Sequence, residues 1–313
     1  MQRIRRRLIA AGVGLVGSGL VGCSAETALL RRVRPPGLPR QVELDDTPFY
    51  PQDDYQCGPA ALAMVLGRIG LTVTPEQLAS QVFLPGRQGS LQIEMLSGAR
   101  RNAALAIEIP STLEALMRET AAGHPVVVLL NLGLSWAPSW HYAVVIGYDL
   151  DEEVFLLRSG PMKRQALPFR TFELTWNRAG RWAFVALPAG QLAVTVDEGG
   201  TTHALVAFEK AAAPEYAAMA YRSALVRWPG SLTLQMGLGN SLYRLRDLHG
   251  AEKAFRMAAH SHDAAVAWNN LANVLLELGH PDEASRAAEK AVSLGGPTER
   301  AARETLGRLR ARQ

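Results

Sequence analysis

One thiol and one distant histidine are the residues of this chain best suited to chemistry. Cys57 stands in Tyr-Gln-Cys-Gly-Pro-Ala-Ala (55–61), where a polar loop passes into an apolar stretch. A thiol at a helix N-terminus lies at the positive end of the helix dipole, which lowers its pKa and favours the nucleophilic thiolate. His141 can take up the thiol proton and return it to a leaving group. The pair predicts nucleophilic catalysis.

Each of the two residues also has a purely structural interpretation. Cys57 can be a small buried apolar side chain, and His141 a solvated histidine at a strand end. We favour catalysis because the two residues complete one mechanism. The only other cysteine, Cys23, lies in an N-terminal export signal, so no internal disulfide is expected. No cluster with metal-ligand spacing and no glycine-rich phosphate loop occurs, so neither a metal nor a cofactor is predicted.

The elements that must position Cys57 and His141 are helices first and strands afterwards. Apolar residues at helical spacing predict a helix over 58–69, and further helices are predicted from Thr74, over 90–102 and from Ser111. Capping boxes mark the starts at Thr74 and Ser111. Strands are predicted at 104–109, 125–132, 142–149, 154–157 and 182–187, with a short helix at 169–177. This order predicts an α+β domain, with N-terminal helices packed on an antiparallel sheet.

These motifs resemble a known family of peptidases. Gln52, the sequence Cys57-Gly-Pro-Ala-Ala on a helix, and His141-Tyr opening a strand that ends Gly147-Tyr-Asp are similar to papain-like cysteine peptidases related to the bacteriocin-leader (double-glycine) processing peptidases. The resemblance spans roughly 48–187 and implies a papain-like fold. It implies that Cys57 is the nucleophile, His141 the general base and acid, and Gln52 the oxyanion-hole donor. Gln56, beside the cysteine, is an alternative donor.

The chain departs from this family at the third catalytic position. The family usually carries Asp or Asn there, and this sequence has Ser159. A serine hydroxyl can orient an imidazole but offers no charge to stabilise imidazolium. Asp149 is an unsuitable substitute, because it lies eight residues beyond His141 on the same strand, about 26 Å away at ordinary strand rise. The sequence therefore predicts either a weakened Cys-His-Ser site or a dyad.

Three other residues near the site receive simpler interpretations. His124 precedes a proline at a helix-to-strand turn and is expected to face solvent. Trp136 and Trp140 flank the histidine, and they either line a substrate cleft or cover the end of the sheet.

The C-terminal half of the chain repeats itself with a period near 34 residues. Asn240-Ser-Leu-Tyr-Arg-Leu aligns with Asn273-Val-Leu-Leu-Glu-Leu, and an Ala-Phe-Ala pattern at 251, 255 and 258 matches alanines at 284, 288 and 291. This period resembles tetratricopeptide repeats. We expect about three repeats with a closing helix over 298–310; an ordinary helical bundle is the alternative. Such repeats form concave surfaces that hold peptides or proteins, so a protein partner is predicted here.

The N-terminus reads as an export signal. Four arginines precede an apolar run over 8–21 that ends in Leu-Val-Gly-Cys23 and resembles a bacterial lipobox, which implies lipidation at Cys23. An uncleaved anchor is the alternative. Ser24 in place of Asp favours the outer membrane, so we predict a periplasm-facing lipoprotein of the bacterial cell envelope. The basic segment that follows is expected to be an extended tether whose arginines contact anionic head groups.

Charge excludes one class of partner. The chain has 33 Lys+Arg against 29 Asp+Glu, but residues 1–22 hold four arginines and no acid, so the remainder is balanced and no nucleic-acid surface is indicated. The predicted organisation is signal peptide (1–22), flexible tether (23–41), papain-like domain (42–190), linker (191–201) and tetratricopeptide-like repeats (202–313). The predicted function is hydrolysis of peptide or protein substrates by a cysteine peptidase. An inactive binding module and an acyl transferase with the same Cys-His pair are the alternatives.

Overall fold

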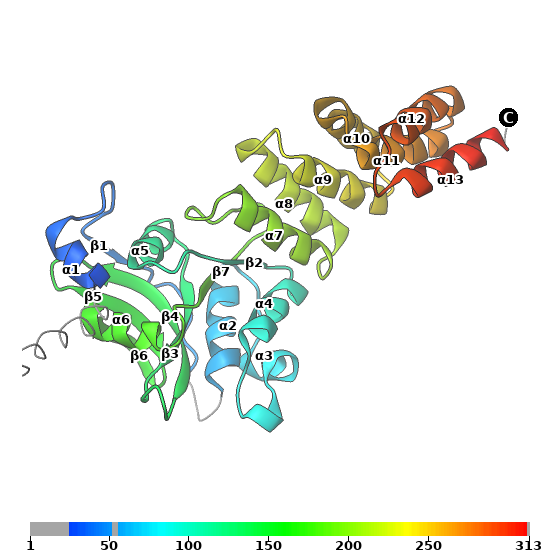
Figure 1. Ribbon diagram of the computed structural model, residues 1–313. Helices are drawn as coiled ribbons and strands as arrows, with labels where there is room; N and C mark the ends of the chain where they lie inside the picture. The colour runs from blue at the N-terminus through cyan, green and yellow to red at the C-terminus, as the bar shows by residue number, and fades with distance from the viewer. Residues whose placement is uncertain (1–24, 52–55, 312–313) are drawn as a thin grey trace, which may run out of the picture.

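The chain folds into an α+β part followed by a helical part (Figure 1). This computed structural model describes residues 25–51 and 56–311. The strands are β1 (Gln41–Glu43), β2 (Leu105–Glu108), β3 (Val126–Asn131), β4 (Trp140–Asp149), β5 (Val154–Ser159), β6 (Met162–Pro168) and β7 (Ala183–Leu187). The helices of the α+β part are α1 (Ala25–Arg32), α2 (Cys57–Arg68), α3 (Pro75–Val82), α4 (Gln92–Arg101), α5 (Leu113–Ala121) and α6 (Phe169–Asn177).

The strands form one antiparallel sheet in the order β2-β7-β3-β4-β5-β6, and β1 pairs with the later half of β4. β4 is the longest strand and lies near the middle, with His141 at its start, opposite Leu130 of β3. The register of β4 against β5 shifts between Val145 and Gly147. A Cβ at Gly147 would lie 2.2 Å from the Val42 carbonyl oxygen, so only glycine lets β1 approach β4 this closely.

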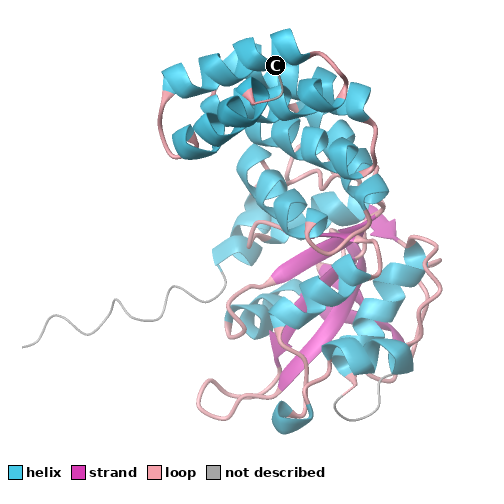
Figure 2. Ribbon diagram, turned by 90° about the vertical axis from the view of Figure 1, so that its right-hand side faces the viewer, coloured by secondary structure: helices cyan, strands magenta, loops and turns pink. Residues whose placement is uncertain are grey.

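Alternating residues of the sheet enter two separate hydrophobic cores, one on each face. Val127, Leu129 and Val144 pack against α2, α3 and α4. Val126 and Val128 belong to the opposite core, which also contains residues of α5 and α6. Because β3 is buried on both faces, its sequence Val-Val-Val-Leu-Leu shows no polar alternation. Figure 2 shows the sheet lying between helices in this three-layer arrangement.

Most elements of the α+β part agree with the sequence expectations. The helix after Cys57, the Thr74 capping box and the short helix Phe169–Asn177 are confirmed. The second expected capping box is wrong, because Thr112 and not Ser111 is the N-cap and accepts from the Ala115 amide. Strands β1 and β6 were not expected. β6 is mostly exposed and polar, so its sequence lacks an apolar face to signal it.

The region predicted as a flexible tether is instead structured from Ala25 onward. Ala25–Arg32 forms α1, which packs against α6. Arg31, Arg34 and Arg40 form ion pairs with carboxylates of Glu153 and Asp151, and the expected contact with head groups stays a prediction. Acidic residues of the β4–β5 turn therefore neutralise this segment. The predicted signal peptide and Cys23 lie outside the described residues.

The helical part consists of paired antiparallel helices and a closing helix. These are α7 (Glu198–Glu209), α8 (Pro214–Arg227), α9 (Leu232–Arg244), α10 (Leu248–His262), α11 (Ala265–Glu277), α12 (Pro281–Leu294) and α13 (Glu299–Arg310). The repeating residues fall at equivalent places, with Phe255 of α10 and Ala288 of α12 both buried between helices. The described helices thus form three pairs closed by α13, as the period near 34 residues predicted.

The two parts share a hydrophobic core, because α7 packs on β2. Leu205 and Phe208 of α7, with Tyr221 of α8, belong to the same buried cluster as β-sheet residues Leu105 and Leu187. The segment expected to be a linker is therefore packed and not free, and its Ala193 is fully buried.

A buried carboxylate ties this segment to the α+β part. Glu119 of α5 is fully buried and accepts from the Thr195 amide (2.7 Å) and hydroxyl (2.6 Å). Its other oxygen lies 2.7 Å from His124 Nδ1. His124 is 8% exposed, so the expectation that it faces solvent is wrong. A buried acid needs polar partners, and the histidine is one of them.

Candidate active site

Cys57 is the first residue of α2, which places its side chain at the positive end of the helix dipole. Residues 58–66 of this helix are all buried, so the helix is fixed between the sheet and its neighbours. A Cβ at Gly58 would lie 2.4 Å from Ser90 Oγ. The missing side chain after the cysteine therefore lets the segment before α4 approach the thiol.

The surroundings of the sulfur affect its acidity in opposite directions. Burial raises the pKa of Cys57, while hydrogen bonds from the backbone amides of Tyr142, Gly58 and Cys57 itself lower it; burial has the larger effect, and the net shift is upward. The expectation that the helix dipole lowers the Cys57 pKa is thus wrong in its net direction. The backbone donors are present, but the cost of desolvating a thiolate exceeds their effect.

The donor Tyr142 is the residue that follows His141, so the start of β4 lies beside the cysteine. His141 Nε2 lies 3.0 Å from Ser159 Oγ at the end of β5. This contact engages Nε2 and not the other ring nitrogen, Nδ1. Burial lowers the pKa of His141, which favours the neutral imidazole. Ser159 therefore contacts the ring at the position where the family resemblance implies Asp or Asn.

Cys57 and His141 line the same cavity, which has a volume of about 790 Å³. One wall is the segment from Arg87 to Gln92, the first residue of α4, and another contains Ser139, Trp140 and Gly160. Tyr142 donates from its hydroxyl to the Ser90 carbonyl (3.1 Å), which joins the first wall to β4. No catalytic motif in the sequence predicts the Arg87–Gln92 wall. Its only sequence signal is the glycine at position 58, which lets Ser90 approach α2 closely.

The hairpin between β3 and β4 carries exposed aromatic and apolar residues. Trp140 lines the cavity and is 56% exposed, so it lies at a cleft as one of the two interpretations predicted. Trp136 is 83% exposed and is not among the lining residues. The Asn131 side chain accepts from the Gly133 and Ser139 amides, both at 3.0 Å, and fixes the hairpin.

A buried arginine supports the strand end that carries Ser159. Arg158 is 2% exposed and donates to the backbone carbonyls of Asp45, Thr47 and Lys163. These contacts join β5 to the segment that leads into the loop before Cys57. Successive residues of a strand face opposite sides, so Arg158 anchors β5 while Ser159 contacts the imidazole.

The remaining described candidates are not among the residues that line this cavity. Gln52 lies outside the described residues, and Gln56 is an exposed N-cap residue that is not among those lining the cavity. Asp149 accepts from the amides of Asp151 and Glu152 in a turn, at the end of β4 opposite to His141. In the described part of the chain, no group of three or more His, Cys, Asp or Glu side chains can hold a metal ion.

Family models match a segment in each part of the chain. Residues 44–184 match the Peptidase_C39 like family. This C39-like domain contains Cys57, His141 and Ser159. Residues 265–295, which contain α11 and α12, match the tetratricopeptide repeat. No curated protein matches the sequence significantly.

Solved structures resemble part of the chain at low identity. A candidate C39-like peptidase from Bacillus anthracis is 21% identical, with a TM-score of 0.40; the match covers 48% of this chain and 98% of that one. Two structures of MamA are 22% and 21% identical, with TM-scores of 0.31 and 0.32; the matches cover 34% and 36% of this chain and 61% and 68% of those proteins.

Proposed function

We propose that this protein is an exported, lipid-anchored cysteine peptidase that hydrolyses peptide bonds with Cys57 and His141. The arrangement of these two residues carries the proposal. The amide next to His141 donates to the Cys57 sulfur, and both side chains line one cavity. Ser159 engages Nε2, so Nδ1 would be the nitrogen that takes up the thiol proton. The match to the C39-like family supports the same chemistry.

The reaction would proceed through a thioester. As Cys57 Sγ attacks the substrate carbonyl carbon, its proton passes to His141 Nδ1. The backbone amide at the start of α2 and the predicted donor Gln52 would stabilise the oxyanion. The C–N bond then breaks, and His141 returns the proton to the leaving amine. Water, deprotonated by the same nitrogen, hydrolyses the thioester and restores the thiol.

The resting pair would be neutral. Burial raises the pKa of Cys57 and lowers that of His141, so both shifts favour thiol and imidazole over thiolate and imidazolium. Ser159 supplies no negative charge to oppose this. Proton transfer would therefore accompany nucleophilic attack instead of preceding it.

The repeats and the N-terminus have supporting roles in this proposal. The paired helices of the repeats form a surface that would dock a protein substrate or partner. Cys23 would carry the lipid that holds the protein at the periplasmic face of the envelope, with the outer membrane favoured. Among residues 25–51 and 56–311, no helix combines the length and the apolar character needed to cross a bilayer.

A thiol-reactive peptide probe and a peptide hydrolysis assay test the catalytic proposal together. Labelling should disappear in Cys57→Ala and fall at least tenfold in His141→Ala, since general-base catalysis typically contributes ~10²–10⁴. His249→Ala, in the repeats, is the matched histidine control and should label like the wild type. Equal labelling of the His141→Ala and wild-type proteins would overturn the assignment of His141 as the base.

A binding module without catalysis is the second candidate. The upward pKa shift of Cys57 and the uncharged partner of His141 favour it. Peptide that binds in the cavity without being cleaved, with slow labelling that is unchanged in His141→Ala, would support this candidate. A product whose mass includes an added amine would indicate acyl transfer in place of hydrolysis.

A further inference from the structure

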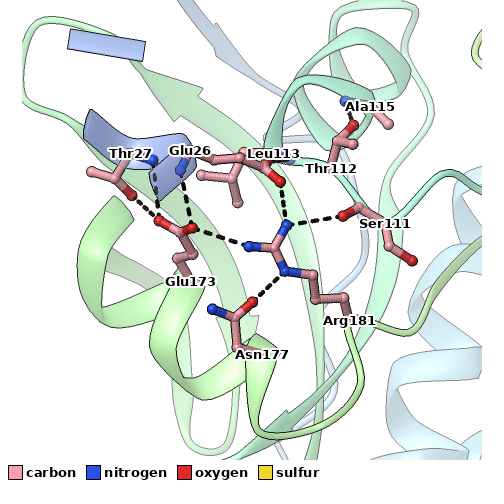
Figure 3. Close-up of polar contacts among 9 residues, drawn as sticks. All are labelled: Glu26, Thr27, Ser111, Thr112, Leu113, Ala115, Glu173, Asn177 and Arg181. Atoms are coloured by element: carbon pink, nitrogen blue, oxygen red, sulfur yellow. Dashed lines mark hydrogen bonds and ion pairs between the residues drawn. The ribbon is translucent and has the colours of Figure 1, made fainter. Parts of the chain in front are cut away.

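A buried carboxylate holds the N-terminal helix α1 on the α+β part (Figure 3). Glu173 of α6 is fully buried and accepts from the Thr27 amide at 3.1 Å, the Thr27 hydroxyl at 2.5 Å and the Glu26 amide at 3.3 Å. Thr27 is 3% exposed. The first turn of α1 is therefore fixed by its side chains and its backbone together.

An arginine connects this contact to the rest of the domain. Arg181 forms ion pairs with Glu26 and with Glu173, the latter at 3.0 Å, and donates to the Ser111 carbonyl at 3.1 Å. Glu26 also accepts from the Leu113 amide at the start of α5, at 2.7 Å. Residues of α5, of α6 and of the loop after α6 thus hold the first turn of α1.

The two sides of α1 differ in character. Leu30 packs against the core of the α+β part, on the side of Thr27. The opposite side presents Leu29 and Val33, four residues apart, which are 57% and 60% exposed. Arg32 is also exposed and has no ion pair among the described residues, whereas carboxylates neutralise Arg31, Arg34 and Arg40. An apolar pair beside one unpaired cation suits the interface of a lipid bilayer.

The short stretch of chain between Cys23 and α1 indicates that a lipid bilayer covers the side of α1 with Leu29 and Val33. Ala25 is only two residues beyond Cys23, so their Cα atoms are at most about 7 Å apart. A lipid on Cys23 would therefore hold the first turn of α1 at the membrane surface. In Figure 1, α1 lies at one end of the molecule and the repeats extend away from the other.

We propose that α1 is a membrane-apposed helix that sets the orientation of the whole protein. Leu29 and Val33 lie in the interfacial layer of the bilayer, and the contacts of Glu173 and Arg181 transmit that orientation to the domain. The repeats then project away from the membrane at a fixed angle. This inference rests on the lipid anchor at Cys23 in the proposed function.

The test places a fluorophore at the proposed contact. The full-length chain with Cys57→Ser and Val33→Cys is expressed with its signal, labelled with bimane and reconstituted in phosphatidylcholine vesicles that contain doxyl-labelled lipid. Val226→Cys in the same background is the control, because Val226 is 86% exposed on α8. We expect at least about twofold stronger quenching at position 33, since an interfacial helix lies ~5–10 Å into the head-group boundary.

The possible results separate failure of the lipid anchor from failure of the proposed role of α1. Mass spectrometry that finds no acyl group on Cys23 would overturn both the anchoring part of the proposed function and this inference. An acylated, vesicle-bound protein with equal, weak quenching at the two positions would overturn the inference alone, because Val33 would then lie away from the bilayer. Neither result affects the proposed peptidase chemistry, which the Cys57 and His141 variants test separately.

Discussion

His141 is held by a hydroxyl and not by a carboxylate: its Nε2 lies 3.0 Å from Ser159 Oγ at the end of β5. A neutral partner fixes the ring but does not favour its protonated form. Both members of the Cys57–His141 pair are also desolvated, which raises the pKa of the thiol and lowers that of the imidazole. The arrangement of the residues therefore favours catalysis by Cys57 and His141, whereas the two pKa shifts favour an un-ionised thiol. The two predictions can be tested separately.

Ser159→Asp should convert the site towards an ion pair. A carboxylate beside the imidazole should raise the His141 pKa by about 1–3 and, through a charged His141, lower that of Cys57. NMR of the histidine ring and ultraviolet absorbance of the thiolate measure the two shifts. Ser159→Asn is the matched control, because it keeps a polar partner without charge. A His141 pKa equal in the two variants would show that the introduced carboxylate does not reach the ring.

The wild-type thiol should ionise above the usual cysteine pKa of about 8.5. Burial favours the protonated thiol, so the thiolate fraction should be small at neutral pH and rise through an alkaline midpoint. Thiolate absorbance and iodoacetamide labelling across pH measure this midpoint. A labelling rate already at its plateau in mildly acidic solution would instead indicate a preformed ion pair and contradict the neutral resting state.

The sequence predicted the elements of the site because their signals are local. The apolar spacing after Cys57 and the residues that follow His141 each specify an element without reference to the rest of the fold. Ser159 was found because a family pattern assigned a position to it. The net acidity of Cys57 was not predictable, because it depends on how deeply neighbouring segments bury the sulfur.

The missed features depend on contacts between distant segments. His124 reads as a solvated turn residue until Glu119 is placed 2.7 Å away. The docking of α1 requires Glu173, about 146 residues later in the chain. The sharing of one core by α7 and the sheet likewise has no local signature. Contacts between segments far apart in the sequence become visible only in the folded structure.

Glu119→Leu should destabilise the protein by about 3–5 kcal/mol. It removes a buried acceptor and leaves the Thr195 amide, the Thr195 hydroxyl and His124 without their partner. Glu114→Leu on the same helix is the control; its ion pair with Arg118 is partly exposed and should contribute less than about 1 kcal/mol. Denaturant unfolding measures the change in the free energy of unfolding for both variants. Equal effects would mean that Glu119 does not hold the segment around Thr195.

The shared core makes α7 part of the same hydrophobic cluster as the sheet of the C39-like domain. Phe208 is fully buried in the cluster that also covers one face of the sheet, so Phe208→Ala should cost about 3–5 kcal/mol. A fragment of residues 25–190 should expose that face, bind a hydrophobic dye and lose a cooperative thermal transition. A fragment of residues 25–245 retains α7, α8 and α9 and should keep the transition. If the shorter fragment melted cooperatively with unchanged Cys57 labelling, the C39-like domain would be an independent folding unit, and the contact with α7 would be dispensable.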